Sequence, residues 1–252
     1  MRVINSAAVL AGMRREKLVV LWYVCPELGC RFTDLFLPVN EPDIKIIDIT
    51  SLKDSKKIYY QASARQRFGN ADILAARDDG GSLSEGFVSS LGKRVYISTW
   101  EHFYPSGDYS LYRPVPELQS RIDDMTLHFG ESCTGVHIRR TDNTVSMGKS
   151  TTEQFISEME KALEKRPATR FFLATDDIDE EKTLRGLFPG KIISNQERDP
   201  SRDSLSGMKD AVVDLFCLAA CDHLIGSYWS SFTDTAADMH GIEKVIAGDC
   251  KP

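Results

Sequence analysis

Strands and helices alternate regularly from Pro114 to the end of the chain, and this alternation constrains the fold more than any other feature. Short apolar runs predict five strands, at 133–139, 169–175, 191–194, 223–227 and 243–248. Stretches with helical periodicity lie at 114–129, 150–165, 178–188, 207–221 and 231–241, and the pattern Ser150-x-x-Glu153 predicts a capping box at the start of the second stretch. This order is typical of a parallel sheet that is covered by helices on both faces. The sequence therefore predicts an α/β fold.

The pattern before Pro114 is less regular. It predicts a helix at 2–16 and strands at 17–24, 44–49, 56–61 and 94–99, whereas the turn-rich stretch 62–92 is expected to form loops. Prolines gather at 105–116 and indicate a boundary there. We therefore expect two Rossmann-like halves, residues 1–113 and residues 114–252.

Polar side chains follow several of the predicted strands in the C-terminal half. Open parallel sheets bind ligands beyond the carboxyl ends of their strands. The groups expected at this edge are Arg139, Arg140, Asp142, Asp176, Asp177, Asn195 and the segment 226–231. They come from four strands and should converge on one site.

Two adjacent arginines end the strand at 133–139. A guanidinium is a planar fork that matches two phosphate oxygens. Because side chains alternate along a strand, His137 and Arg139 should point to one face and Arg140 to the other. Arg139 and Arg140 are therefore expected to have different roles, one binding phosphate and the other stabilising the loop. The alternative is that both form ion pairs with acidic surface residues. His137 is either a hydrogen-bonded core histidine or a ligand contact.

Ser230 and Ser231 directly precede a predicted helix. The first N–H groups of a helix favour an anion, and serine hydroxyls add donors, although both serines also suit ordinary caps. Together with Arg139 and Arg140, the two serines suggest a pyrophosphate site without a metal.

Three aspartates are further candidates. Asp176 and Asp177 suit either metal binding or, as we expect, recognition of hydroxyls or a base edge. Asp214 lies within an apolar helical stretch and needs a partner, for which an arginine of the strand-end cluster is the natural candidate.

Composition excludes several classes of protein. The net charge of −6 and the pI of about 5.5 do not suit a nucleic-acid coat. The chain has no apolar run of membrane-spanning length, and its N-terminus is too interrupted for a signal peptide, so a cytoplasmic protein is expected. The six cysteines contain no CxxC pair and are expected to be free thiols. There is no GxGxxG, GxxxxGK[ST] or GxSxG motif for a dinucleotide, P-loop or hydrolase site.

His137-Ile-Arg139-Arg140-Thr-Asp142 resembles the HxRRxD motif of the α1,6-type fucosyltransferases. The segment 173–177 and the later arrangement of Asp214, Asp222 and Gly226 to Ser231 resemble the second and third motifs of that family, in the same order. The resemblance extends over residues 133–240. It implies a bacterial-type enzyme with a GT-B-like fold that uses GDP-fucose as donor, inverts the anomeric carbon and needs no metal or cofactor. The N-terminal half would be reduced, because this chain opens on a helix where related chains open with a strand, and it would serve the glycan acceptor.

The resemblance also implies roles for individual residues. Arg139 would bind the donor pyrophosphate and assist the departing GDP, with Arg140 in support and Asp214 paired with Arg139. The remaining candidates for nucleotide-sugar binding are His137, Asp176, Asp177, Ser227, Ser230 and Ser231.

One departure concerns the general base. Eukaryotic relatives have a glutamate shortly after the first motif, whereas the stretch 144–150 here contains no carboxylate. Asp142 and Glu153 are the candidates to replace it. Two alternatives therefore stay open: a glycosyltransferase with another nucleotide sugar, and a non-catalytic protein that binds a nucleotide or a glycan. The sequence does not indicate an oligomeric state.

Overall fold

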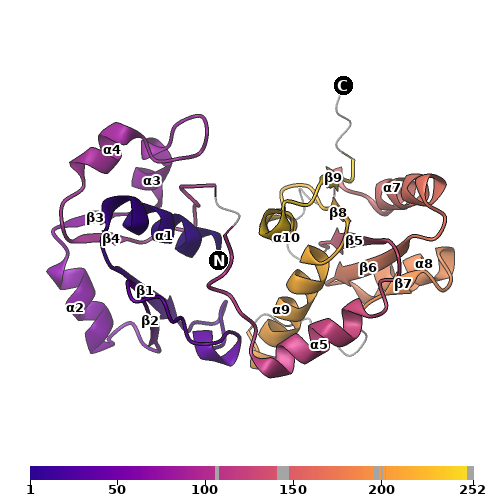
Figure 1. The fold of residues 1–252 in the computed structure, drawn as a ribbon, viewed down its shortest axis with the longest axis horizontal. Helices are drawn as coiled ribbons and strands as arrows, with labels where there is room; N and C mark the ends of the chain where they lie inside the picture. The colour runs from indigo at the N-terminus through magenta and orange to yellow at the C-terminus, as the bar shows by residue number, and fades with distance from the viewer. Residues whose placement is uncertain (106–107, 141–147, 196–198, 200, 202, 249–252) are drawn as a thin grey trace. The chain divides into compact units, whose positions relative to one another are not determined.

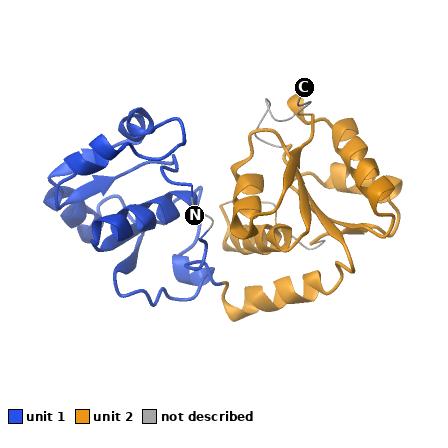
Figure 2. Cartoon of the chain, turned by 45° about the horizontal axis from the view of Figure 1, so that its top comes forward, with its two compact units in different colours: residues 1–113 blue, residues 114–252 orange. Residues whose placement is uncertain are grey.

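The computed structural model describes residues 1–105, 108–140, 148–195, 199, 201 and 203–248. The chain divides into two compact units, Met1–Arg113 and Pro114–Pro252 (Figure 2). Each unit has its own hydrophobic core. Among the described residues, none of the helices combines the length and the apolar character that crossing a bilayer would require.

The second unit is built on a five-stranded sheet in which every pairing is parallel. Its strands are β5 (Cys133–Ile138), β6 (Arg170–Thr175), β7 (Ile192–Ile193), β8 (His223–Gly226) and β9 (Lys244–Ile246). Their order is β7-β6-β5-β8-β9, so β5 is central, with Val136 in register with Leu173 of β6 and Ile225 of β8. The predicted parallel sheet of the C-terminal half is thus confirmed.

Helices cover both faces of this sheet (Figure 1). They are α5 (Pro116–Thr126), α7 (Thr152–Lys165), α8 (Ile178–Leu187), α9 (Leu205–Ala219) and α10 (Ser231–His240). Val136 and Leu173 belong to the core cluster that includes Phe155 of α7 and Leu184 of α8. On the opposite face, a Cβ atom added to Gly135 would lie 2.9 Å from Leu218 of α9, so this helix packs closely on the strand. Central strands buried on both faces explain the continuous apolar runs in the sequence.

The first unit contains two separate two-stranded parallel sheets, β1-β2 and β3-β4. Its elements are α1 (Arg2–Arg14), β1 (Leu18–Tyr23), η1 (Phe32–Asp34), β2 (Ile44–Ile49), α2 (Ser55–Ser63), β3 (Gln66–Phe68), α3 (Asn70–Ala76), α4 (Glu85–Ser90) and β4 (Val95–Ile97). Leu10, Ile73, Leu83 and Phe103 are buried in one core cluster of this unit.

Three local predictions are wrong. Residues 56–61 belong to helix α2 and not to a strand, because the Asp54 carboxylate caps the helix by accepting the Lys56 N–H at 2.8 Å. The stretch 62–92 contains β3, α3 and α4 in place of the expected loops. Helix α7 is capped one residue later than the Ser150-x-x-Glu153 pattern suggests, since the Thr151 N–H donates to Gln154 Oε1 at 2.7 Å.

Candidate functional site

Residues from three strands are connected where β5, β6 and β8 end. The backbone N–H of Arg139 donates to Ser227 Oγ, after β8, at 3.0 Å. The backbone N–H of Arg140 donates to Asp176 Oδ1, after β6, at 2.8 Å. The structure therefore gathers these predicted residues at the carboxyl edge of the sheet, where open parallel sheets bind ligands.

His137 links this edge to helix α10. Its Nδ1 lies 2.8 Å from Thr233 Oγ1 and 3.4 Å from Ser230 Oγ, and its ring lies 4.8 Å from the ring of Phe232. The Ser227 hydroxyl is fully buried and donates to the His137 carbonyl at 3.2 Å. Ser227 thus fastens the end of β5 to the end of β8, which is a positioning task and not an exposed ligand contact.

The N-terminus of α10 faces the same edge. Ser230 is its N-cap, and within the described residues the Ser230 side chain makes no capping hydrogen bond to the helix. Ser230 is buried, whereas Ser231 is exposed. A ten-residue helix whose first N–H groups lack a side-chain cap provides donors and a positive dipole end for an anion.

Arg140 points to the opposite face of the sheet from His137, as strand alternation predicts. Its guanidinium donates to Glu180 Oε1 of α8 at 2.9 Å, to the Ser150 carbonyl at 2.7 Å and to Thr152 Oγ1 at 3.3 Å. It also lies 5.6 Å from the Phe155 ring. The side chains of Arg140 and Glu180 are only 10% and 9% exposed, so this is a buried ion pair. The geometry fits a brace rather than a ligand contact.

Ser150 connects Arg140 to the loop before α10. Its hydroxyl accepts the Tyr228 N–H at 2.8 Å and donates to the Ala247 carbonyl at 2.6 Å. The Lys149 ammonium lies 4.6 Å from the centre of the Tyr228 ring. Arg140 therefore holds Ser150, and Ser150 holds the loop that carries the start of α10.

Asp176 and Asp177 serve different backbone donors. Asp176 accepts the Arg140 N–H, whereas Asp177 Oδ1 caps α8 by accepting the N–H groups of Asp179 and Glu180 at 2.8 and 3.1 Å. Their carboxylates are thus directed apart, which disfavours a shared metal. Over the described parts of the chain, no three His, Cys, Asp or Glu side chains are grouped as metal ligands.

Three further aspartates belong to the predicted motifs. Asp214 is 8% exposed within α9, and its pairing with Arg139 stays a prediction. Asp142 lies outside the described residues. Asp222 lies at the amino end of the sheet, where its carboxylate accepts the Cys133 N–H at 3.0 Å, so it joins β8 to β5 far along the strand from Arg139.

Trp229 has an unusual backbone. Its φ is 54°, in the left-handed region that bulky side chains rarely adopt, and its side chain is 80% exposed. Such a conformation costs on the order of 1–3 kcal/mol and persists only when the surroundings hold it. The bonds that fix Tyr228 and Ser230 on either side supply this restraint.

Three residues that support the site were not among the predicted site residues. Thr233, Ser150 and Glu180 each bond to a predicted site residue or to its loop. Thr233 follows the predicted helix start at Ser231, but the local sequence does not indicate that Thr233 contacts His137. Glu180 is one of three acids in the first turn of α8, and this local pattern does not distinguish it as the partner of Arg140.

Helix α10 packs closely against β8 at Gly226. A Cβ atom there would lie 2.2 Å from Thr233 Cγ2 and 2.7 Å from Thr233 Oγ1. Gly226→Ala should therefore displace Thr233, break its bond with His137 and lower the free energy of unfolding by about 1–3 kcal/mol. Urea unfolding measures this change. Gly186→Ala in α8, where an added Cβ meets no atom within 4 Å, is the matched control and should not destabilise the protein; equal stability of the two variants would contradict the predicted clash.

The α/β fold with parallel sheets matches solved structures of GT-B-like fucosyltransferases. NodZ α-1,6-fucosyltransferase soaked with GDP-fucose matches with a TM-score of 0.60 and 18% identity, over 94% of this chain and 86% of that chain. NodZ from Bradyrhizobium matches with the same TM-score and identity over 92% and 86%. POFUT1 in complex with GDP matches with a TM-score of 0.59 and 10% identity, over 98% and 94%. No protein-family model matches the chain, and no curated protein matches its sequence.

Proposed function

We propose that this protein is a glycosyltransferase that moves fucose from GDP-fucose to a hydroxyl group of a glycan, with inversion and without a metal ion. One observation carries the proposal. Arg139 and the uncapped start of α10 share the carboxyl edge of a sheet whose fold resembles NodZ, a protein solved with GDP-fucose. A cationic fork and a helix N-terminus are suited to a pyrophosphate.

The reaction would be a direct displacement. The acceptor oxygen forms a bond to the anomeric carbon of fucose while the bond from that carbon to the β-phosphate oxygen breaks. The bonding electrons remain on GDP, where negative charge develops. Arg139 and the α10 N–H groups would stabilise this charge; a preorganised donor of this kind is typically worth about 3–4 kcal/mol.

The other residues would position these groups. His137 and Ser227 fix the ends of β5 and β8, and Arg140 supports the loop through Ser150. Asp176 and Asp177 stay candidates for contact with the nucleotide, and Asp214 for orientation of Arg139. In this scheme residues 114–252 bind the donor, and residues 1–113 serve the acceptor.

The acceptor proton needs a base, and Asp142 and Glu153 are the proposed candidates. Glu153 lies in the first turn of α7. Hydrogen bonds from its own backbone N–H and from Thr151 lower the pKa of its carboxyl, and the charge of Arg140 adds to this effect. A carboxylate with a lowered pKa is a weaker base, which disfavours Glu153 in this role.

The lack of a carboxylate in the stretch 144–150 supports a second candidate function, a non-catalytic nucleotide- or glycan-binding protein. Titration calorimetry with GDP, UDP and ADP, followed by a transfer assay with GDP-fucose on a panel of glycans, separates the two. We expect preferential GDP binding and fucose transfer. Selective GDP binding without hydrolysis or transfer would favour the binding protein, and absence of a preference for GDP would overturn the donor assignment.

Removal of divalent cations should leave fucose transfer unchanged. The proposed charge stabilisation comes from Arg139 and backbone N–H groups, which a chelator does not affect. Initial rates with and without an excess of EDTA measure this. A loss of activity that is restored by added Mg²⁺ or Mn²⁺ would contradict the metal-independent scheme.

A further inference from the structure

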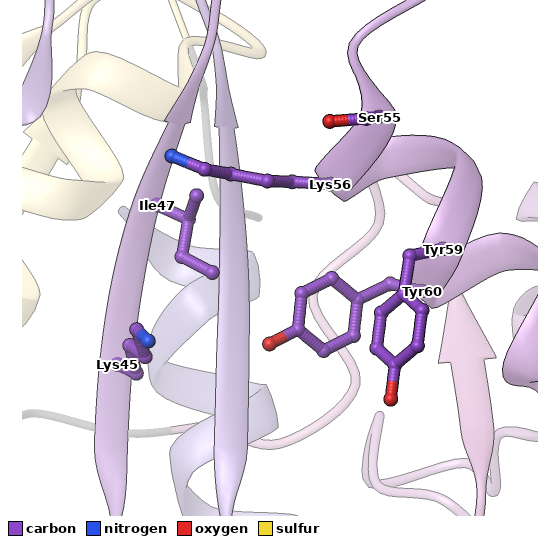
Figure 3. A pocket seen from close by; sticks show the side chains of 6 residues that line it. All are labelled: Lys45, Ile47, Ser55, Lys56, Tyr59 and Tyr60. Atoms are coloured by element: carbon purple, nitrogen blue, oxygen red, sulfur yellow. The ribbon is translucent and has the colours of Figure 1, made fainter.

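A pocket of about 340 Å³ lies in the first unit, between strand β2 and helix α2. Its size falls at the lower end of the roughly 300–1,000 Å³ that small-molecule sites occupy. The lining residues are Lys45, Ile47, Ser55, Lys56, Tyr59 and Tyr60. Figure 3 shows Lys56 reaching from the first turn of α2 toward β2, with the two tyrosine rings beside one another on the same helix.

Two cations of this pocket lack a counter-charge. Within the parts of the chain that the structure describes, the ammonium groups of Lys45 and Lys56 make no ion pair or hydrogen bond. The two acids of the stretch 45–57 bond backbone groups and not these ammonium groups: Asp48 accepts the Phe32 N–H, and Asp54 caps α2 by accepting the Lys56 N–H. The pocket is therefore locally positive although the chain has a net charge of −6.

The helix itself adds to this positive character. No residue of α2 is acidic, and Lys56 and Lys57 lie in its first turn, where the helix dipole disfavours cations. An anion in the pocket would remove this unfavourable arrangement. The ammonium groups and the hydroxyls of Ser55, Tyr59 and Tyr60 are all donors to an oxyanion.

The tyrosines indicate what carries the anion. Tyr59 is 62% exposed, and its ring centre lies 5.3 Å from that of Tyr60, at an angle of 78° between the ring planes. No described residue of α2 is buried, so its aromatic side chains do not serve a core. Exposed rings with a hydroxyl tip favour ligands that have both apolar faces and polar groups, as saccharides do.

We propose that the pocket between β2 and α2 binds an acidic saccharide unit, with its carboxylate or sulfate held by Lys45 and Lys56 and its ring against Tyr59. This inference rests on the proposed function in that it takes a glycan as the occupant. It goes further in assigning charge to that glycan: the preferred acceptor carries an acidic sugar.

A matched pair of saccharides tests the proposal by calorimetry. The probe is a tetrasaccharide of alternating glucuronate and N-acetylglucosamine, and its partner is the same compound with the carboxylates reduced to hydroxymethyl groups. The acidic form should bind at least about tenfold more tightly, with an affinity that falls as salt is added. Equal binding of the two forms would overturn the proposal.

Three variants assign the binding to this pocket. Lys45→Gln combined with Lys56→Gln should weaken the acidic probe about tenfold, whereas the nearby exposed Lys53→Gln should not. Tyr59→Ala should weaken the saccharide but not inorganic phosphate. An unchanged affinity in the double lysine variant, or phosphate binding as tight as that of the saccharide, would refute the assignment. GDP affinity, measured on the same samples, reports separately on the donor site and on folding.

Discussion

Replacement of Arg139 by alanine should abolish fucose transfer and weaken GDP much more than guanosine. Arg139 follows β5, and its backbone is fastened to Ser227 beside the start of α10. If its guanidinium holds the pyrophosphate, its loss removes charge-assisted hydrogen bonds that only a phosphate-bearing ligand makes. We expect turnover to fall by about a hundredfold or more and GDP affinity by about 30-fold or more, with guanosine nearly unaffected. Calorimetry and initial rates measure both effects.

Two further variants sharpen this test. Arg139→Lys keeps the charge but not the planar fork, so it should recover only part of the GDP affinity. Arg166→Ala, at the exposed C-cap of α7, is the matched control and should leave both ligands unchanged. If Arg139→Ala weakens GDP and guanosine equally, Arg139 does not contact phosphate.

The second large effect concerns stability. Arg140→Ala leaves the Glu180 carboxylate buried without its cation, and such a loss typically costs about 3–5 kcal/mol. It also removes the donor to the Ser150 carbonyl, so the loop before α10 should loosen. We therefore expect a large fall in the free energy of unfolding, measured by urea denaturation with circular dichroism.

An exposed ion pair on the same helix provides the control. Lys182 and Asp179 of α8 are 71% and 89% exposed, so Lys182→Ala should change stability by less than about 1 kcal/mol. The double change Arg140→Met with Glu180→Leu should cost less than the sum of the single changes, because neither charge is then buried alone. A variant Arg140→Ala as stable as Lys182→Ala would show that this pair is not the brace that we describe.

The sequence predicted the fold best where the periodicity of strands and helices extends over long stretches. In residues 114–252 the helical and strand periods alternate, and the five strands and their flanking helices follow within a few residues. Periodicity also placed His137 and Arg140 on opposite faces of β5. In residues 1–113 the elements are short, and α2 presents tyrosines with high strand propensity on a helix that a single cap, Asp54, defines.

The contacts of the candidate site were harder to predict. His137 meets Thr233 across 96 positions, and Ser150 meets Tyr228 across 78, so neither pair leaves a local pattern. Arg140 and Glu180 are 40 positions apart, with α7 and β6 between them in the sequence. The rule that ligands bind at the carboxyl ends of parallel strands identified the edge of the sheet. It could not distinguish residues that stabilise this edge from residues that face a ligand. Ser227 shows this, since its hydroxyl is directed to the backbone of β5.

A crystal structure with GDP soaked in is the most direct test of phosphate binding by Arg139. We expect the diphosphate to lie at the carboxyl edge of the five-stranded sheet, within hydrogen-bonding distance of the Arg139 guanidinium and of the first N–H groups of α10. Arg140 should still be paired with Glu180 in that structure. GDP bound at another place, or bound with its phosphates away from Arg139, would show that this edge is not the donor site.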